Sequence, residues 1–228
     1  MIAGLPRELG DLFEATSFAV LVTVDGRGHP VAAGVPARHD AENMCFELTS
    51  NAGLADAHVA MALVAPPAQI CVQGTAAPAG SARVRVRPER VLHWPDGDLD
   101  GEPVLYDARL EEVRSHHNQE PERPHETPAD GTQTRWDDRL DALAALDGAQ
   151  GTLAVIAPDG FPFAVRVPVT PDRDGGTVRI GADPVGAPFE PGPAALLLAD
   201  DEGELLLRGD LLEDAGTWVL RPHDGARA

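Results

Sequence analysis

The sequence contains no lysine, so all 18 of its basic side chains other than histidine are arginine. Aspartate and glutamate together number 37, which gives a formal net charge of -19 at pH 7. Proteins bind nucleic acid phosphates and anionic membrane surfaces through clustered lysine and arginine side chains. The charge balance therefore argues against nucleic acid and against a membrane surface as partners.

Cysteine is also scarce. Cys45 and Cys71 lie inside apolar runs and lack the paired spacing of a metal site, which favours two buried thiols in a reducing compartment over a disulfide. No run approaches the roughly 20 apolar residues that span a bilayer. The N-terminus MIAGLPRELGDLF lacks the basic start and long apolar core of a signal peptide. We therefore expect a cytoplasmic protein.

The apolar runs that are present occur twice in the same order. FAVLVTVDGRGHP (18–30) and TLAVIAPDGFP (152–162) each combine an apolar run, an Asp-Gly turn and a proline that opens another apolar run. Four more pairs follow: Cys45–Ser50 with Thr177–Ala182, Ala60–Pro66 with Ala194–Asp200, Gln69–Gly74 with Glu204–Gly209, and Val84–Pro88 with Trp218–Pro222. Five matched segments in one order indicate an internal duplication.

The matched segments are typical of antiparallel β-structure, because they are short, rich in Val, Leu, Ile and Ala, and separated by Gly, Asp and Pro. In VRVRVRP the valines at 84 and 86 face one side and the arginines at 83, 85 and 87 the other. A helical pattern precedes each half, over 5–13 and 135–146. We predict a mainly β fold with a few helices, divided into repeat 1 (1–94), an acidic, Pro-rich connecting segment (95–134) and repeat 2 (135–228).

FAVLVTVDGRGHPVAAGVPARHDAENMCFELTS, with HVAMALVAP, QICVQGTA and VRVRPERV, resembles the pyridoxamine 5'-phosphate oxidase-like, FMN-binding split-barrel superfamily. The resemblance covers residues 5–92 and, through the repeat, 136–222. It implies two split β-barrel units in one chain that form an intrachain pseudo-dimer, with flavin in the grooves between the barrels. The protein is then either a monomer of this kind or a homodimer.

The resemblance also implies cofactor-binding residues. Arg38 matches a basic residue near the flavin phosphate, Thr49 and Ser50 match a group whose hydroxyls and backbone amides contact flavin, and Gln69 matches a glutamine near the ring. The chain departs from the family at NAGLADAH (51–58), which has no basic residue where a phosphate dianion needs Arg or Lys and helix N-terminal amides. We therefore expect a degenerate phosphate site in repeat 1. Repeat 2 is poorer, with Arg166 and Arg179 as isolated positive charges.

Several functions remain open at this point. With FMN bound, the protein would be a flavin-dependent oxidoreductase that acts on a small organic or quinone-like substrate, because the flavin ring supplies the redox chemistry. Deazaflavin F420 is an alternative cofactor, and haem a further one, with His93 beside Trp94 as its single candidate contact. A different class is a cofactor-free barrel pair whose groove binds a small ligand or a partner peptide. The catalytic residues are unknown, since there is no Ser-His-Asp order, phosphate-binding glycine loop or CxxC motif.

A metal site is not expected. DGDLDG (96–101) begins like an EF-hand loop, but Pro103 and Asp107 stand where such a loop needs an aliphatic residue and a bidentate glutamate, so we favour an acidic turn. The histidines at 116, 117 and 125 lie in a polar segment without a third ligand at helical spacing. They are interpreted as solvated.

Overall fold

The computed structural model describes residues 6–50, 57–65, 67–99, 101–107, 149–172, 175–181, 189–200 and 203–227. These residues form one helix and thirteen strands, so the mainly β prediction is confirmed. The elements are α1 (Arg7–Ala15), β1 (Phe18–Val24), β2 (Pro30–Asp40), β3 (Cys45–Thr49), β4 (Ala57–Ala65), β5 (Ala68–Pro78), β6 (Arg83–Trp94), β7 (Val104–Asp107), β8 (Gln150–Ile156), β9 (Pro162–Asp172), β10 (Thr177–Ile180), β11 (Gly192–Asp200), β12 (Gly203–Asp214) and β13 (Thr217–Arg227).

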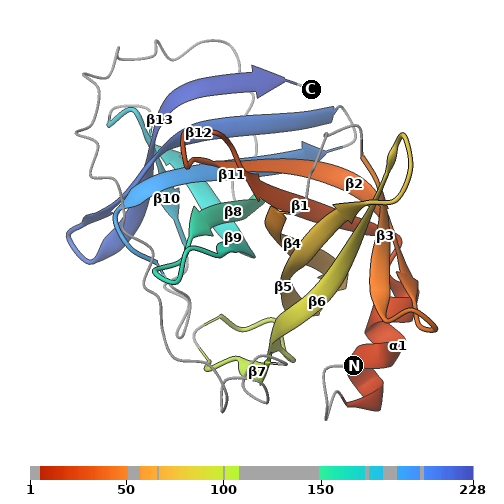
Figure 1. Ribbon diagram of the computed structural model, residues 1–228. Helices are drawn as coiled ribbons and strands as arrows, with labels where there is room; N and C mark the ends of the chain where they lie inside the picture. Colours follow the sequence, from red (N-terminus) through yellow and green to blue (C-terminus); the bar gives the residue numbers. More distant parts are fainter. Residues whose placement is uncertain are drawn as a thin grey trace.

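The strands form two closed six-stranded barrels with the same connectivity (Figure 1). In barrel 1 the strand order is β3-β2-β1-β4-β5-β6, closed by pairing of β3 with β6, and β7 is added beside β6. In barrel 2 the order is β10-β9-β8-β11-β12-β13, closed by pairing of β10 with β13. Each strand from β1 to β6 therefore has an equivalent from β8 to β13 with the same neighbours, and the chain contains the predicted pair of barrels.

A β-bulge shared by both barrels is the most specific sign of duplication. The register shifts directly after Gln73 in the β5–β6 pair and directly after Arg208 in the β12–β13 pair. The residue that follows each shift is a glycine paired with a proline: Gly74 with Pro88, and Gly209 with Pro222. A Cβ on either glycine would lie 2.1 Å from a carbonyl oxygen of the partner strand. Both bulges therefore require glycine.

The first hairpins of the two repeats are equivalent, but their Asp-Gly pairs are not. Gly28 N donates to Asp25 O, and Gly160 N donates to Ala157 O, so Gly28 is the equivalent of Gly160. Both glycines have φ near +80°, at 81° and 82°. Asp25 is thus the equivalent of Ala157, and the turn glycine and the following proline are what the two hairpins share.

One segment of the repeat alignment is wrong by one residue. Val22 pairs with Ala60 in barrel 1, and the equivalent residue Ala154 pairs with Ala195 in barrel 2. Ala60 therefore matches Ala195, whereas the sequence comparison matched it with Ala194. The reason is that the middle parts of β4 and β11 are buried on both faces, so they show no alternation from which the register could be predicted.

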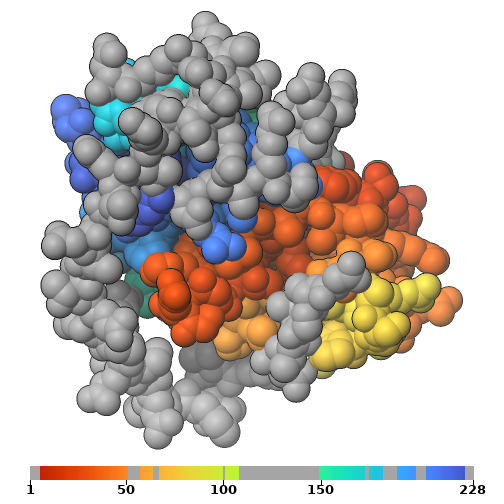
Figure 2. All heavy atoms as spheres, turned by 90° about the horizontal axis from the view of Figure 1, so that it is seen from above, coloured from red at the N-terminus to blue at the C-terminus, as the bar shows by residue number. Residues whose placement is uncertain are grey.

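The two barrels pack as an intrachain pseudo-dimer, as predicted. Each contact that barrel 1 makes with β9 has an equivalent contact that barrel 2 makes with β2. Strands β1, β4 and β5 contact β9, and their equivalents β8, β11 and β12 contact β2. In Figure 2, red and orange atoms of β1 and β2 lie against blue atoms of barrel 2. We call the zone where β2 lies on barrel 2 the β2 seam, and the zone where β9 lies on barrel 1 the β9 seam.

Side chains alternate between the barrel interior and the seams. Ala19 and Leu21 of β1 point into barrel 1, where Leu9 and Phe13 of α1 also pack. Val20, the residue between them, instead joins an apolar cluster that extends into barrel 2. Burial of both faces of β1 therefore stabilises each barrel and the contact between them.

The connecting segment predicted over 95–134 begins within the first sheet, since β7 pairs with β6. The helix predicted over 135–146 and most of the connecting segment lie outside the described residues. Among the residues that are described, no helix has the length and apolar character needed to cross a membrane.

Candidate functional site

Two glutamine side chains of β5 attach barrel 1 to β9. Gln69 Nε2 donates to Arg166 O at 2.9 Å, and Arg166 N donates to Gln69 Oε1 at 3.1 Å. Four residues further along β5, Gln73 Nε2 donates to Pro162 O at 2.8 Å. These bonds satisfy backbone groups of β9 in the seam that would otherwise lack partners. Both polar atoms of the Gln69 amide are thus engaged in holding the two barrels together.

The equivalent position in the β2 seam carries an acid instead of an amide. Glu204 of β12 is the equivalent of Gln69, and Gly34 of β2 is the equivalent of Arg166. Gly34 N donates to Glu204 Oε2 at 3.4 Å. An ionised carboxylate only accepts hydrogen bonds, so Glu204 cannot reproduce the donor half of the Gln69 contact. At this position, the described residues of the β2 seam form one long hydrogen bond where those of the β9 seam form two.

The space over Gly34 is already occupied by neighbouring side chains, so this position has no room for a Cβ. A Cβ at this position would lie 1.9 Å from Glu204 Oε1 and 2.5 Å from Phe18 Cζ. Phe18 is 36% exposed, although most large apolar side chains of the described residues are buried. Phe18 pairs with Pro36, two residues beyond Gly34 on β2. The Phe18 ring and the Glu204 carboxylate thus both lie over the Gly34 backbone.

The structure places Arg38, Thr49 and Ser50 together near one end of barrel 1. Arg38 and Thr49 are exposed, because the alternate residues Ala37 and Leu48 point into the barrel. Arg38 pairs with Glu47, two residues before Thr49 on β3. The three predicted residues therefore share the neighbourhood of the β2–β3 pair.

Gln69 does not lie with these three residues. Thr49 pairs with Arg83 at the start of β6, whereas Gln69 pairs with Trp94 at its end. The strand has 12 residues, which at about 3.3 Å per residue places the two pairs on the order of 35 Å apart along it. Gln69 belongs to the β9 seam, and its equivalent in the β2 seam is Glu204.

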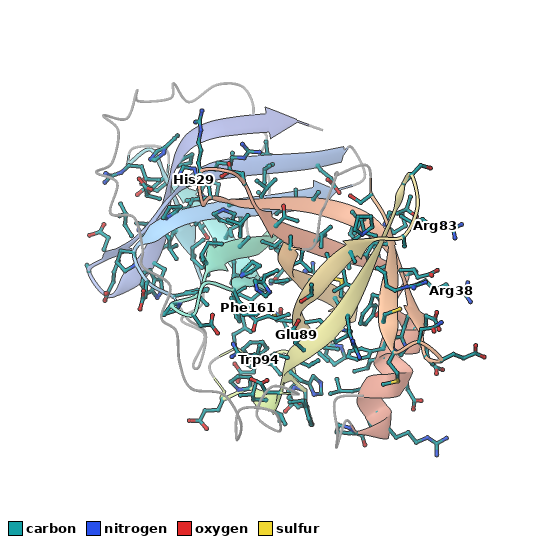
Figure 3. All side chains as sticks on the ribbon, in the orientation of Figure 1. His29, Arg38, Arg83, Glu89, Trp94 and Phe161 are labelled. Carbon is teal, nitrogen blue, oxygen red and sulfur yellow. The ribbon has the colours of Figure 1, made fainter. Side chains whose placement is uncertain are left out.

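Arginine and acidic side chains lie together at the Arg38 end of β2, since Asp40 ends the strand and Glu47 pairs with Arg38. Arg85 Nη2 donates to Glu47 Oε1 at 3.2 Å, and this bond raises the pKa of the arginine. Neither Arg38 nor Arg83 has an ion-pair partner among the described residues, and both lie at the same end of barrel 1 (Figure 3). Arg38 and Arg83 lie on the two strands that flank β3, which ends at Thr49, and two arginines so placed form a suitable environment for an anion.

We define the β2 face as the outward side of β2 and the residues beside it: Phe18, Gly34, Pro36, Arg38, Thr49, Arg83 and Glu204. Sequence reasoning missed Phe18, Arg83 and Glu204 as site residues. The alternation in VRVRVRP was the available signal for Arg83, and the repeat partner of Gln69 was the signal for Glu204. No signal distinguished Phe18, because an aromatic residue at the start of a strand is ordinarily buried.

A separate polar cluster lies in the β9 seam. Arg90 contacts Asp107 of β7 at 3.0 Å and Asp159 of the β8–β9 hairpin at 2.9 Å. Its Nη1 also donates to Gln73 Oε1 at 3.1 Å. Every one of these groups is engaged with another, so the cluster connects β5, β6 and β7 to barrel 2 and presents no unused group to a ligand.

His93, the residue considered for haem, is 8% exposed and shares the interior side of barrel 1 with its cross-strand partner Ile70. Its Nε2 has no hydrogen-bond partner among the described residues, and burial lowers its pKa. Trp94 Nε1 donates to Gly101 O at 3.1 Å. Both rings are enclosed by protein.

The described part of DGDLDG (96–99 and 101) contains a turn, and Leu99 is buried in the core. Gly97 N donates to Trp94 O at 3.1 Å within this turn. In the described ranges there is no group of three or more His, Cys, Asp or Glu residues that could hold a metal ion. The histidines at 116, 117 and 125 lie outside those ranges.

No protein-family model matches the chain, and no curated protein is similar to it in sequence. A solved structure is similar over 45% of this chain and 93% of its own chain, with 22% sequence identity and a TM-score of 0.37.

Proposed function

We propose that the protein is a flavin-binding split-barrel pair that holds one FMN molecule along the β2 face. The observation that supports this proposal most is the order of groups along β2. Arg38 and Arg83 lie at one end, and the exposed Phe18 ring follows, next to the Glu204 carboxylate over Gly34. Gly34 and Arg38 are four residues apart, or about 13 Å along a strand. This span suits an extended FMN molecule.

Each part of the face suits a different part of FMN. Arg38, Arg83 and Thr49 would bind the phosphate through charge-assisted hydrogen bonds. Phe18 would contact the ring, since an exposed aromatic side chain packs well against a planar ligand. The bound flavin would supply two-electron transfer, so the proposed activity is that of a flavin-dependent oxidoreductase acting on a small organic substrate. Buried, free Cys45 and Cys71 fit a cytoplasmic location within this proposal.

Titration of FMN fluorescence tests the proposal. We expect saturable quenching by the wild-type protein and at least about tenfold weaker binding by Arg38→Ala, because a charge-assisted bond to the phosphate is lost. Arg179→Ala is the matched control, since Arg179 is also an exposed strand arginine but lies in barrel 2. Absence of saturation in the wild-type protein would contradict the proposal, as would equal weakening by both substitutions.

The cofactor-free binding module is the second candidate, and Glu204 is the observation that favours it. A carboxylate at the seam and a net charge of -19 both oppose the approach of an anionic cofactor. Under this alternative, the wild-type protein would leave FMN, F420 and haem spectra unchanged at every concentration. The β2 face would then bind a small uncharged or cationic ligand.

A further inference from the structure

We propose that α1 is a pH-dependent cap of barrel 1, which undocks when two histidines beside it are protonated. α1 packs against β2 and β3, and Figure 1 shows it beside β3. The two histidines are His39 of β2 and His93 of β6. The inference goes beyond the proposed function, because α1 and these histidines are not part of the β2 face.

Few contacts hold α1 in place. Of its nine residues, only Leu9 and Phe13 are buried. Its N-cap residue, Pro6, forms no side-chain capping bond, and its last turn carries no basic residue. A helix this short is not stable by itself in water, so it depends on the packing of its two buried side chains. We therefore expect α1 to separate from barrel 1 at a lower free energy than unfolding of the strands requires.

Two buried ring nitrogens lie next to this helix. The His39 ring packs against two aromatic rings, with centroid distances of 5.4 Å to Phe13 of α1 and 5.1 Å to Phe46 of β3. Its Nδ1 is buried without a hydrogen-bond partner among the described residues. His93 is 8% exposed, its Nε2 is buried in the same way, and the Glu8 carboxylate of α1 acts on it. Docking of α1 thus encloses two nitrogens that lack partners.

The surroundings of His39 disfavour its charged form. Protonation would place a charge where water is excluded and where no acceptor is in position for Nδ1. The carboxylates that face this ring are Glu14 of α1 and Asp40 of its own strand, and β3 presents the apolar Phe46. Burial lowers the pKa of His39 by more than the two carboxylates raise it. A proton therefore binds His39 more readily when water can reach the ring.

His93 behaves in the same way. Its cross-strand neighbours, Ile70 of β5 and Val104 of β7, are apolar. Tyr106 of β7, a titratable residue, packs against the same apolar cluster, and Glu8 is the carboxylate that faces the imidazole. Burial lowers the pKa of His93 by more than Glu8 raises it. Since both histidines bind protons more readily once α1 has left, protonation favours the undocked helix.

Hydrogen exchange of the α1 amides at pH 7.5 and 5.5 tests the inference, with each rate compared with that of an unstructured peptide at the same pH. In the wild-type protein the protection of α1 should fall by up to about tenfold for each histidine. The reason is that an accessible imidazole with a pKa of 6.5 is about nine-tenths protonated at pH 5.5. His39→Phe and His93→Leu should each remove part of this decrease, and the double variant should show none. The exposed His58→Gln is the control and should respond like the wild-type protein.

The inference is overturned if the wild-type protection of α1 is the same at both pH values, or if the double variant keeps the decrease. Equal protection of α1 and the core strand β4 would also overturn it, because α1 would then exchange only when the whole protein unfolds. Leu12→Ala weakens the packing of α1 without removing a histidine, so it should lower protection at both pH values and keep their ratio. Loss of that ratio would contradict the role of the histidines. If the double variant does not fold, the two single variants decide the question.

Discussion

Two histidines with buried ring nitrogens should make the stability of this protein depend on pH. His93 Nε2 and His39 Nδ1 are buried without hydrogen-bond partners among the described residues. Burial lowers the pKa of both side chains, and nearby carboxylates, Glu8 for His93 and Glu14 and Asp40 for His39, oppose the shift. Each histidine is therefore neutral in the folded protein at a pH where it is already protonated in the unfolded chain.

The free energy of unfolding should accordingly fall as the pH decreases from 7.5 to 5.5. A histidine whose pKa is lower in the folded state stabilises the protein fully above its unfolded pKa of 6.5 and progressively less below it, because the unfolded chain binds the proton more readily. Urea unfolding at several pH values measures this dependence. His93→Leu should flatten it, and the exposed His58→Gln should not. An equal slope in wild-type protein and His93→Leu would contradict the assignment.

At the scale of the strand, the bulges at Gly74 and Gly209 bring residues of β6 and β13 into the same positions in both barrels. Gly74→Ala should lower the free energy of unfolding by about 1–3 kcal/mol, because the new Cβ would lie 2.1 Å from the backbone oxygen of Arg87. Denaturant unfolding checks this value. Gly10→Ala is the control, since it meets nothing within 4 Å in α1 and should stabilise by about 0.5–1 kcal/mol. Similar effects of the two substitutions would show that the bulge does not require glycine.

The strands also show what the sequence could and could not predict. Strict alternation, as in Val84 and Val86, identified a strand with one buried face, and the repeat identified the barrel pair. The register of β4 could not be predicted, because Ala60 and its neighbours are buried on both faces. Arg38, Thr49 and Ser50 were predicted as one group and lie together. Gln69 was predicted to lie with them, because the sequence does not reveal which residues face the opposite barrel. In the structure Gln69 of β5 contacts β9, and its equivalent Glu204 of β12 contacts β2.

At the scale of the molecule, duplication within one chain has allowed the two seams to diverge. In a homodimer both seams are identical by symmetry. In this chain the Gln69–Arg166 contact and the Glu204–Gly34 contact differ in hydrogen bonding and in side-chain volume. Arg38 and Thr49 are matched in repeat 2 by Thr170 and Gly181, which lack a positive charge and a hydroxyl respectively. We therefore expect a single flavin site in the pair of barrels.

The number of FMN molecules bound per chain tests this account most directly. Titration calorimetry of the wild-type protein should reach saturation at one FMN per chain, because the β2 face has Arg38 and Thr49 where repeat 2 has Thr170 and Gly181. Saturation at two FMN per chain would contradict the proposed divergence of the seams. No detectable binding would contradict the flavin site itself.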